Sequence, residues 1–503
     1  MAHVIFCAIF FFYLFGGKIM EIRVFHTHIE VYPYHIGDNF DFEKTLSKWV
    51  EKTSKYGCYE PVGFYVENDI LYLPRGINLS QLASTFRATP TMMHSCDYNE
   101  KIQNANCTCT PRDKTQELTL DFLLCKNDFA KGNLYSQYGL NLDTGDGKTC
   151  CMVMGLMQMK YKAIIITHKT RIKEQWIDTF RQFTDVDEDR LCDIDGTEII
   201  KQIMNDKKEA DFYFVNHQTL QSYARDNGWI AVRNLFQKLK VGIKVIDEAH
   251  KFFRNTLMID FFSDVHKTFY LTATFTRSDP REVTIYKKAF SSVYKFGEDI
   301  EKYVEKRRHI VFIAMFYQSK PEYGEAPSVS TIKGFSSYKY IDYELKLEPN
   351  RTLLKVLNKA LNSVSNLRGR TLVLSPKIET VDMIADYISD RTDKSVGTIH
   401  SKNKQSENEE NFTKDIISST IGSIGEGDNV KGLRNVICLE PIGSKSLLSQ
   451  VVGRLREFSK EDDTFFIYPI DMTLKEPYEL YKRTKSVLKH KCKEIIEMKV
   501  YDV

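Results

Sequence analysis

The sequence predicts an α/β protein in which two tandem parallel-sheet lobes follow a small N-terminal α+β module. Short apolar runs alternate repeatedly with helical segments, a pattern typical of parallel sheets covered by helices. A loop typical of phosphate binding follows an apolar run in the first lobe only. A later run of the same lobe ends in two adjacent carboxylates.

The composition is that of an ordinary soluble globular chain of several domains. Of its 503 residues, 42% are hydrophobic and 27% are charged. The net charge of +3 excludes a strong overall basic field, so any contact with nucleic acid must come from a local groove. The 11 cysteines show no disulfide-like spacing, which favours a reducing, intracellular compartment.

Residues 1–19 form an apolar extension of uncertain membership in the working protein. Its apolar run is too short to span a bilayer, and it has neither a basic segment before the run nor a cleavage site after it. We interpret it as an upstream extension, with a membrane anchor as the alternative. No membrane partner is expected.

Residues 20–107 are predicted to form the accessory domain. Strand-like alternation at 22–25 and 28–32 precedes an amphipathic helix at 42–56, a hairpin at 62–73, and an irregular linker from about 88 to 112. The spacing of His94, Cys96, Cys107 and Cys109 lacks the usual zinc knuckle, so free thiols are favoured over a zinc site. The domain either recognises the substrate or only packs against its neighbour.

The two lobes are predicted at 108–300 and 366–475, joined by a connection with insertions at 301–365. Buried strands are expected at 163–167, 212–215, 244–247 and 269–272 in the first lobe, and at 371–375, 396–400, 436–440 and 465–469 in the second. Residues 476–503 are predicted to be a C-terminal helix region, with a Lys-rich amphipathic helix from about 478 to 498.

The segment 142–149, LDTGDGKT, has the residues that a triphosphate site requires. A site of this kind needs backbone N–H groups at a helix N-terminus, glycines that let the backbone approach, a lysine, and a hydroxyl for Mg²⁺. Lys148 would reach the β- and γ-phosphates and Thr149 would hold the metal. The loop positions before them are Thr144, Gly145, Asp146 and Gly147, and Leu142 stands where the general pattern has its first glycine.

The strand 244–247 would deliver Asp247 and Glu248 to the carboxyl edge of the sheet. Asp247 would hold Mg²⁺ through water, and Glu248 would orient and deprotonate the attacking water. The alternative is an ordinary strand end with a solvated acidic pair.

The order of four segments, TGDGKT, IDEAH, LTATFTRSD and QVVGRLRE, resembles superfamily 2 helicases and translocases. Among these the chain is most similar to XPB-like proteins and to DEAH-type proteins of viral or phage kind, over residues 108–475. The resemblance implies two RecA-like lobes, with ATP and Mg²⁺ as cofactors bound in the cleft between them. It also implies ATP hydrolysis coupled to nucleic acid.

The resemblance assigns further residues. Gln116 would recognise adenine, Gln450 and Arg454 would act on the nucleotide from the second lobe with Arg454 as arginine finger, and Gly427 and Arg456 would contact the nucleotide. Nucleic-acid contact and coupling fall to Lys169, Gln175, Gln218, Thr219, His250, Thr272, Thr274 and Ser375.

Three positions depart from the pattern of the family. Phe275 stands where many relatives have proline, the acid of segment 423–429 is displaced by one position, and Glu457 stands where a second arginine is usual.

The sequence therefore predicts an ATP- and Mg²⁺-dependent helicase or translocase that acts on nucleic acid, with DNA favoured. The alternatives are an RNA helicase or transcript-release factor, a DNA translocase without strand separation, and an inactive nucleotide-binding scaffold. An intracellular location is expected, which for a viral or phage protein means the host cytoplasm or nucleoid.

Overall fold

The chain divides into two compact units, one of Met1–Leu142 with Asp146–Val304 and one of Glu305–Val503 with Asp143–Gly145. The computed structural model describes residues 20–35, 50–52, 59–61, 63–93, 102, 105–142, 145–272, 280–297, 300, 304, 308–321, 327–332, 334–424, 430–459 and 461–500. None of the helices in these ranges has the length and apolarity needed to cross a membrane. The extension predicted at 1–19 lies outside them.

The N-terminal module is built on a five-stranded sheet with the order β5-β6-β2-β1-β7. Its elements are β1 (Glu21–Val24), β2 (His28–Tyr32), β5 (Tyr65–Glu67), β6 (Ile70–Pro74), α3 (Leu79–Phe86) and β7 (Pro90–Met92). The predicted hairpin is confirmed as the antiparallel pair β5–β6. The prediction of an irregular linker from 88 onward is wrong at β7, which pairs in parallel with β1.

A second small pairing in this region replaces part of a predicted helix. β3 (Val50–Lys52) pairs antiparallel with β4 (Tyr59–Pro61). The amphipathic helix expected at 42–56 is therefore wrong at 50–52, which forms this short strand. Its other residues lie outside those described.

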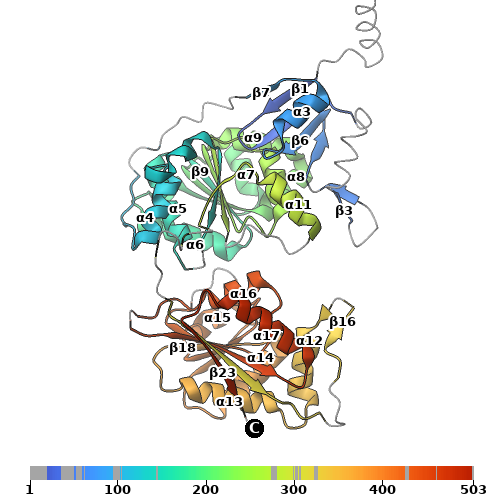
Figure 1. The fold of residues 1–503 in the computed structure, drawn as a ribbon. Helices are drawn as coiled ribbons and strands as arrows, with labels where there is room; N and C mark the ends of the chain where they lie inside the picture. The colour runs from blue at the N-terminus through green and yellow to red at the C-terminus, as the bar shows by residue number, and fades with distance from the viewer. Residues whose placement is uncertain are drawn as a thin grey trace, which may run out of the picture. The chain divides into compact units, whose positions relative to one another are not determined.

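The module shares one hydrophobic core with the first lobe, and its ribbon lies directly beside that lobe in Figure 1. The ring of Tyr72 lies 4.8 Å from that of Phe262, centroid to centroid. The Arg233 guanidinium is 2.7 Å from the buried Glu30 carboxylate and also lies over the Tyr72 ring. Because apolar packing and a buried ion pair both cross this junction, the module and the first lobe form one unit.

The first lobe is a parallel seven-stranded sheet with the order β10-β11-β9-β12-β13-β8-β14. Its strands are β8 (Gln137–Asn141), β9 (Ala163–Thr167), β10 (Leu191–Ile194), β11 (Phe212–Asn216), β12 (Ile243–Asp247), β13 (Lys267–Thr272) and β14 (Tyr294–Phe296). Its helices are α4 (Lys114–Leu123), η2 (Asn127–Leu134), α5 (Lys148–Met159), α6 (Thr170–Phe183), η3 (Glu188–Arg190), α7 (Thr197–Met204), α8 (His217–Asn227), α9 (Trp229–Leu239), α10 (Phe253–Phe261) and α11 (Pro280–Ala289). The four predicted strands of this lobe are confirmed as β9, β11, β12 and β13, and their residues are almost all buried.

The second lobe has a parallel seven-stranded sheet with the order β19-β20-β18-β21-β22-β15-β23 (Figure 1). Its strands are β15 (Ile310–Tyr317), β18 (Arg370–Leu374), β19 (Val396–Ile399), β20 (Ile416–Ser419), β21 (Leu433–Cys438), β22 (Thr464–Asp471) and β23 (Glu494–Lys499), and β16 (Ser330–Thr331) with β17 (Gly334–Phe335) forms a separate hairpin. Its helices are α12 (Ser337–Asp342), η5 (Tyr343–Leu347), α13 (Thr352–Val364), α14 (Ile378–Ser389), α15 (Gln405–Asn411), α16 (Lys445–Val452) and α17 (Lys475–Leu488). The four predicted strands are confirmed as β18, β19, β21 and β22.

Two parts of the second lobe differ from the prediction. The segment 301–365, expected as a connection, contains β15, which lies between β22 and β23 in the sheet. The C-terminal helix expected to reach Met498 ends at Leu488, and β23 then pairs in parallel with β15. In β23 the charged residues at 494, 497 and 499 do not alternate strictly with apolar ones, so the sequence lacks the period of two that is typical of a strand.

Candidate nucleotide and nucleic-acid sites

The phosphate-type loop joins the end of β8 to the start of α5. Gly145 has φ of 99° and Gly147, which caps α5, has φ of 85°. A side chain at Gly147 would overlap the amide nitrogen of Gln116. The loop needs glycine there for conformation and for space.

Two side chains hold the loop from within the first unit. Lys148 Nζ donates to the carbonyl of Leu142 at 2.6 Å. Gln116 Nε2 donates to the carbonyl of Asp146 at 3.3 Å, while its Oε1 accepts from the Arg112 backbone N–H at 2.9 Å. Gln116 is thus fixed against the loop, and its assignment to adenine stays a prediction.

The residues present fit a nucleoside triphosphate with its metal. The first turn of α5 offers unpaired backbone N–H groups and the positive end of the helix dipole. Lys148 and Thr149 are the first two residues of that helix. Thr144 lies outside the described residues. The roles of Lys148 and Thr149 therefore stay predictions with a suitable geometry.

The acidic pair lies at the carboxyl end of β12. Asp247 accepts two hydrogen bonds, one on each carboxylate oxygen: the Trp176 indole N–H at 2.8 Å and the Glu248 backbone N–H at 3.0 Å. Glu248 has a left-handed backbone, with φ of 50°. Such a conformation costs energy in a residue that is not glycine, and it is concentrated at functional sites.

Glu248 is largely desolvated. Its burial and the neighbouring charge of Asp247 raise the pKa of the Glu248 carboxyl to about 7, against the opposing effect of Lys148 and Lys251. Its Oε2 accepts no hydrogen bond, although His250 Nδ1 lies 3.2 Å away. A carboxyl whose pKa lies near neutrality is suited to accept a proton from water.

His250 and Thr272 connect two neighbouring strands at this edge. His250 Nδ1 lies 2.7 Å from Thr272 Oγ1, and both side chains are buried. Thr272 ends β13, the strand inserted between β12 and β8, so this contact lies between the acidic pair and the loop strand. Thr274 lies outside the described residues.

The short loops that lead from β9 into α6 and from β11 into α8 carry or precede four of the predicted nucleic-acid residues of the first lobe. Lys169 is the exposed residue before α6, which also carries Gln175. Gln218 and Thr219 are in the first turn of α8. Asn216 ties the two loops together, because it accepts from Thr167 Oγ1 at 2.8 Å and donates to Thr170 Oγ1 at 3.1 Å.

In the second lobe, the assignment of Ser375 to nucleic-acid contact and coupling stays a prediction. Its side chain is fully buried, and its hydroxyl lies 2.6 Å from Thr380 Oγ1, so it supports the start of α14. An open groove of about 800 Å³ lies beside it at the carboxyl ends of β18, β19 and β20, lined by residues that include Tyr338, Lys377 and Lys402.

The predicted nucleotide contacts of the second lobe lie on and after α16. Gln450 is on this helix, Arg454 follows Gly453 at its C-terminus, and Arg456 is exposed. Gly427 lies outside the described residues.

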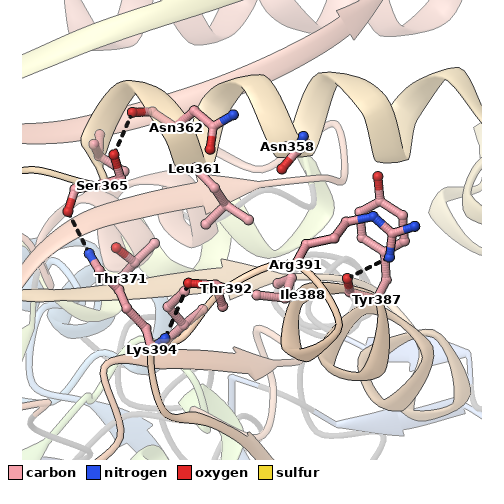
Figure 2. Close-up of a pocket in the computed structure, with 12 residues that line it drawn as sticks. Asn358, Leu361, Asn362, Ser365, Thr371, Tyr387, Ile388, Arg391, Thr392 and Lys394 are labelled. Atoms are coloured by element: carbon pink, nitrogen blue, oxygen red, sulfur yellow. Dashed lines mark hydrogen bonds between the residues drawn. The ribbon is translucent and has the colours of Figure 1, made fainter.

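A separate small cavity of about 50 Å³ lies near the amino ends of β18 and β20. In Figure 2, the Arg391 side chain lies over the ring of Tyr387 and donates to that residue's carbonyl, while Lys394 Nζ donates to the Ser365 carbonyl at 2.7 Å. Sites for small ligands usually span about 300–1,000 Å³. This cavity is therefore no candidate for a nucleotide.

The thiols near the phosphate loop are close together but form no disulfide. Cys109 Sγ lies 3.2 Å from Cys107 Sγ and 3.8 Å from Cys150 Sγ, and all three are free. Within the described ranges, no group of three or more His, Cys, Asp or Glu side chains has a metal-binding arrangement. His94 and Cys96 lie outside those ranges.

Comparison with known proteins shows which proteins this chain is similar to. Residues 109–277 match the family model of the type III restriction enzyme res subunit. Over this stretch the chain is similar to that family, and the relatives described next are similar over longer stretches.

Individual relatives are distant. The chain is 23% identical over 434 residues to L396 of Acanthamoeba polyphaga mimivirus, named as an ATP-dependent RNA helicase, covering 83% of this chain and 74% of that protein. Saccharomyces cerevisiae Dbp5 bound to RNA and ADP–BeF₃ is similar in fold, with a TM-score of 0.51, 14% identity, and coverage of 77% of this chain and 89% of Dbp5. A fragment of a type I restriction-enzyme HsdR subunit from Vibrio vulnificus YJ016 has a TM-score of 0.52, 13% identity, and coverage of 77% and 68%. The prediction of two RecA-like lobes is confirmed by these folds.

Proposed function

We propose that the protein is an ATP- and Mg²⁺-dependent motor that moves along, or separates, strands of nucleic acid. Lys148 and Thr149 bind the phosphates and the metal, Asp247 holds the metal through water, and Glu248 activates the attacking water. Gln450 and Arg454 act on the nucleotide from the second lobe, with Arg454 as an arginine finger. Such fingers contribute about 10³–10⁵ in rate.

One observation carries this proposal. In one sheet, the loop with Lys148 and the Asp247–Glu248 pair both lie at the carboxyl edge, and the pKa of Glu248 is raised to about 7 by burial and by Asp247. Ligands of open α/β sheets bind at this edge. A solvated acidic pair at an ordinary strand end, the alternative, would be exposed, and Glu248 is not.

Contact with nucleic acid is supported in each lobe separately. Lys169 and Gln218 are exposed on two loops that Asn216 ties together. The groove of the second lobe has Lys377 and Lys402 among its lining residues. Amines and loop N–H groups contact phosphates, which gives sequence-independent, salt-sensitive binding.

DNA is the favoured substrate, because the matching family model and one similar fold belong to restriction-enzyme subunits. RNA is the second candidate, because L396 is named as an RNA helicase and Dbp5 is similar when bound to RNA. The mimiviral relative supports a viral origin for this protein. A viral origin is compatible with membership of the XPB-like branch.

The test measures ATP turnover with single-stranded DNA, duplex DNA, forked DNA and RNA. Stimulation by a polynucleotide is expected, and Lys148→Ala and Glu248→Gln should abolish it. The matched controls are Lys201→Ala and Glu198→Gln, at an exposed ion pair on α7. If no polynucleotide raises turnover by the wild-type protein, the motor proposal is wrong. Strand-displacement assays then separate a helicase from a translocase.

A further inference from the structure

The Trp176 indole makes a contact that its place in the sequence did not indicate. The sequence places it beside Gln175 in a segment expected to touch the nucleic-acid backbone. In the structure its side chain is 1% exposed, and its N–H donates to Asp247 Oδ2 at 2.8 Å. A buried tryptophan N–H usually finds an acceptor. Here the acceptor is the carboxylate that the proposed function assigns to the metal.

This contact fixes the orientation of the carboxylate. The terminal torsion of an aspartate is broad, so a carboxylate with a donor on one oxygen can still rotate. Asp247 has one donor on each oxygen, because Oδ1 accepts the Glu248 backbone N–H at 3.0 Å. Each carboxylate oxygen has two lone pairs, so each retains acceptor capacity for a water on the metal.

We propose that Trp176 is a positioning residue that orients Asp247 toward the magnesium–nucleotide complex and links it to the nucleic-acid side of the lobe. Trp176 is on α6, which follows directly after Lys169 and carries Gln175. A shift of α6 when a polynucleotide binds therefore changes the hydrogen bond to Asp247. This second part rests on the proposed function, and the first part does not require a polynucleotide.

The first experiment compares Trp176→Phe with Trp229→Phe. Both changes remove an indole from the first unit, but Trp229 stacks on Phe262 with 5.6 Å between centroids. Binding of a fluorescently labelled ATP analogue is titrated with Mg²⁺ without polynucleotide, and thermal melting confirms folding. Loss of a partner that orients a metal ligand typically costs about 10–100-fold in metal affinity. The half-saturating Mg²⁺ concentration should therefore rise about 10-fold or more in Trp176→Phe only.

A double-mutant cycle shows whether the effect passes through Asp247. In an Asp247→Asn background, Trp176→Phe should raise the half-saturating Mg²⁺ concentration no further. An equal rise in both backgrounds, or no rise with Asp247 intact, would overturn the positioning role. A loss of packing alone would not depend on the carboxylate.

A second measurement does not use activity or affinity. In a Trp49→Phe/Trp229→Phe variant, Trp176 is the remaining tryptophan of the three in the chain. Its emission should change when Mg²⁺ and ADP are added together and stay constant with ADP and a chelator. Constant emission in both, with binding verified by the labelled analogue, would overturn the proposal.

The effect of a polynucleotide on ATP turnover tests the link through α6 separately from the orientation of Asp247. Where the wild type is stimulated, Trp176→Phe should lower the ratio of stimulated to basal turnover, and an unchanged ratio would overturn the link through α6. If the wild type is not stimulated at all, the proposed function and that link both fail. The Mg²⁺ titration then still decides the positioning role by itself.

Discussion

A buried ion pair between β12 and α10 allows a test of what stabilises the first unit. Lys244 is fully buried near the start of β12, and its Nζ lies 2.5 Å from Asp260 Oδ1 and 2.5 Å from Ser263 Oγ. The other oxygen of Asp260 accepts from the Tyr270 hydroxyl at 2.8 Å. The change to test is Asp260→Asn, which keeps the shape of the side chain and removes its charge.

The expected loss in the free energy of unfolding follows from the burial of Lys244. Breaking a buried pair by removing one partner typically costs about 3–5 kcal/mol, because the other charge stays buried without compensation. Burial already lowers the pKa of Lys244, and the charge of Asp260 opposes this. Without that charge the folded state disfavours the ammonium form further. The loss should therefore shrink as the pH rises toward the ordinary lysine value of 10.5.

Urea unfolding followed by tryptophan fluorescence measures this loss in the right unit, because all three tryptophans precede Val304. The double variant Lys244→Met/Asp260→Leu should be close to wild type in stability, since a buried pair replaced by apolar side chains is often neutral. Glu198→Gln, at an exposed pair, is the control and should change little. A loss below about 1 kcal/mol in Asp260→Asn, or a double variant as unstable as the single one, would refute the reasoning.

Three further outcomes are expected. The kcat/KM for ATP should rise as the pH increases through about 7, where Glu248 loses its proton, and a profile without that step would contradict its role as base. Gly147→Ala should reduce ATP binding more than Gly196→Ala, because a side chain at Gly147 overlaps Gln116 whereas Gly196 has open space; equal effects in a nucleotide-binding assay would contradict this. Burial, with the charge of Asp471, raises the pKa of Glu344 well above 4.5, so the second unit should lose stability as the pH rises above that value. Glu344→Gln should remove this loss, as measured by circular dichroism of the unfolding transition that fluorescence does not report.

The buried strands were predictable because their pattern is local. β9 and β11 are continuous apolar runs, and parallel strands covered on both faces require such runs. The sheet to which a strand belongs is a non-local property. β15 is as apolar as β9, but its partner β22 lies some 150 residues later in the chain. The sequence of β15 therefore does not indicate whether the strand belongs to the second lobe or to the connection before it.

The same distinction applies to the site. The loop with Lys148 and the strand ending in Asp247 each have a pattern within a few residues. The bond between Trp176 and Asp247 joins residues 71 apart, and nothing near Trp176 in the sequence indicates which acceptor its N–H meets. The burial of Ser375 was missed for a similar reason, since it depends on Thr380 and on the neighbouring strand β20.

The environments of Asp247 and Glu248 explain how two adjacent carboxylates can take different roles. Asp247 receives an N–H donor on each oxygen, which fixes the orientation of its carboxylate. Glu248 Oε2 receives no hydrogen bond, and the buried Glu248 carboxyl has a pKa of about 7, raised also by the charge of Asp247. Pairs of titratable groups with contrasting environments identify the separate roles in a site. Trp176 bears on both members, because it orients the Asp247 carboxylate, and the charge of Asp247 is one cause of the raised pKa of Glu248.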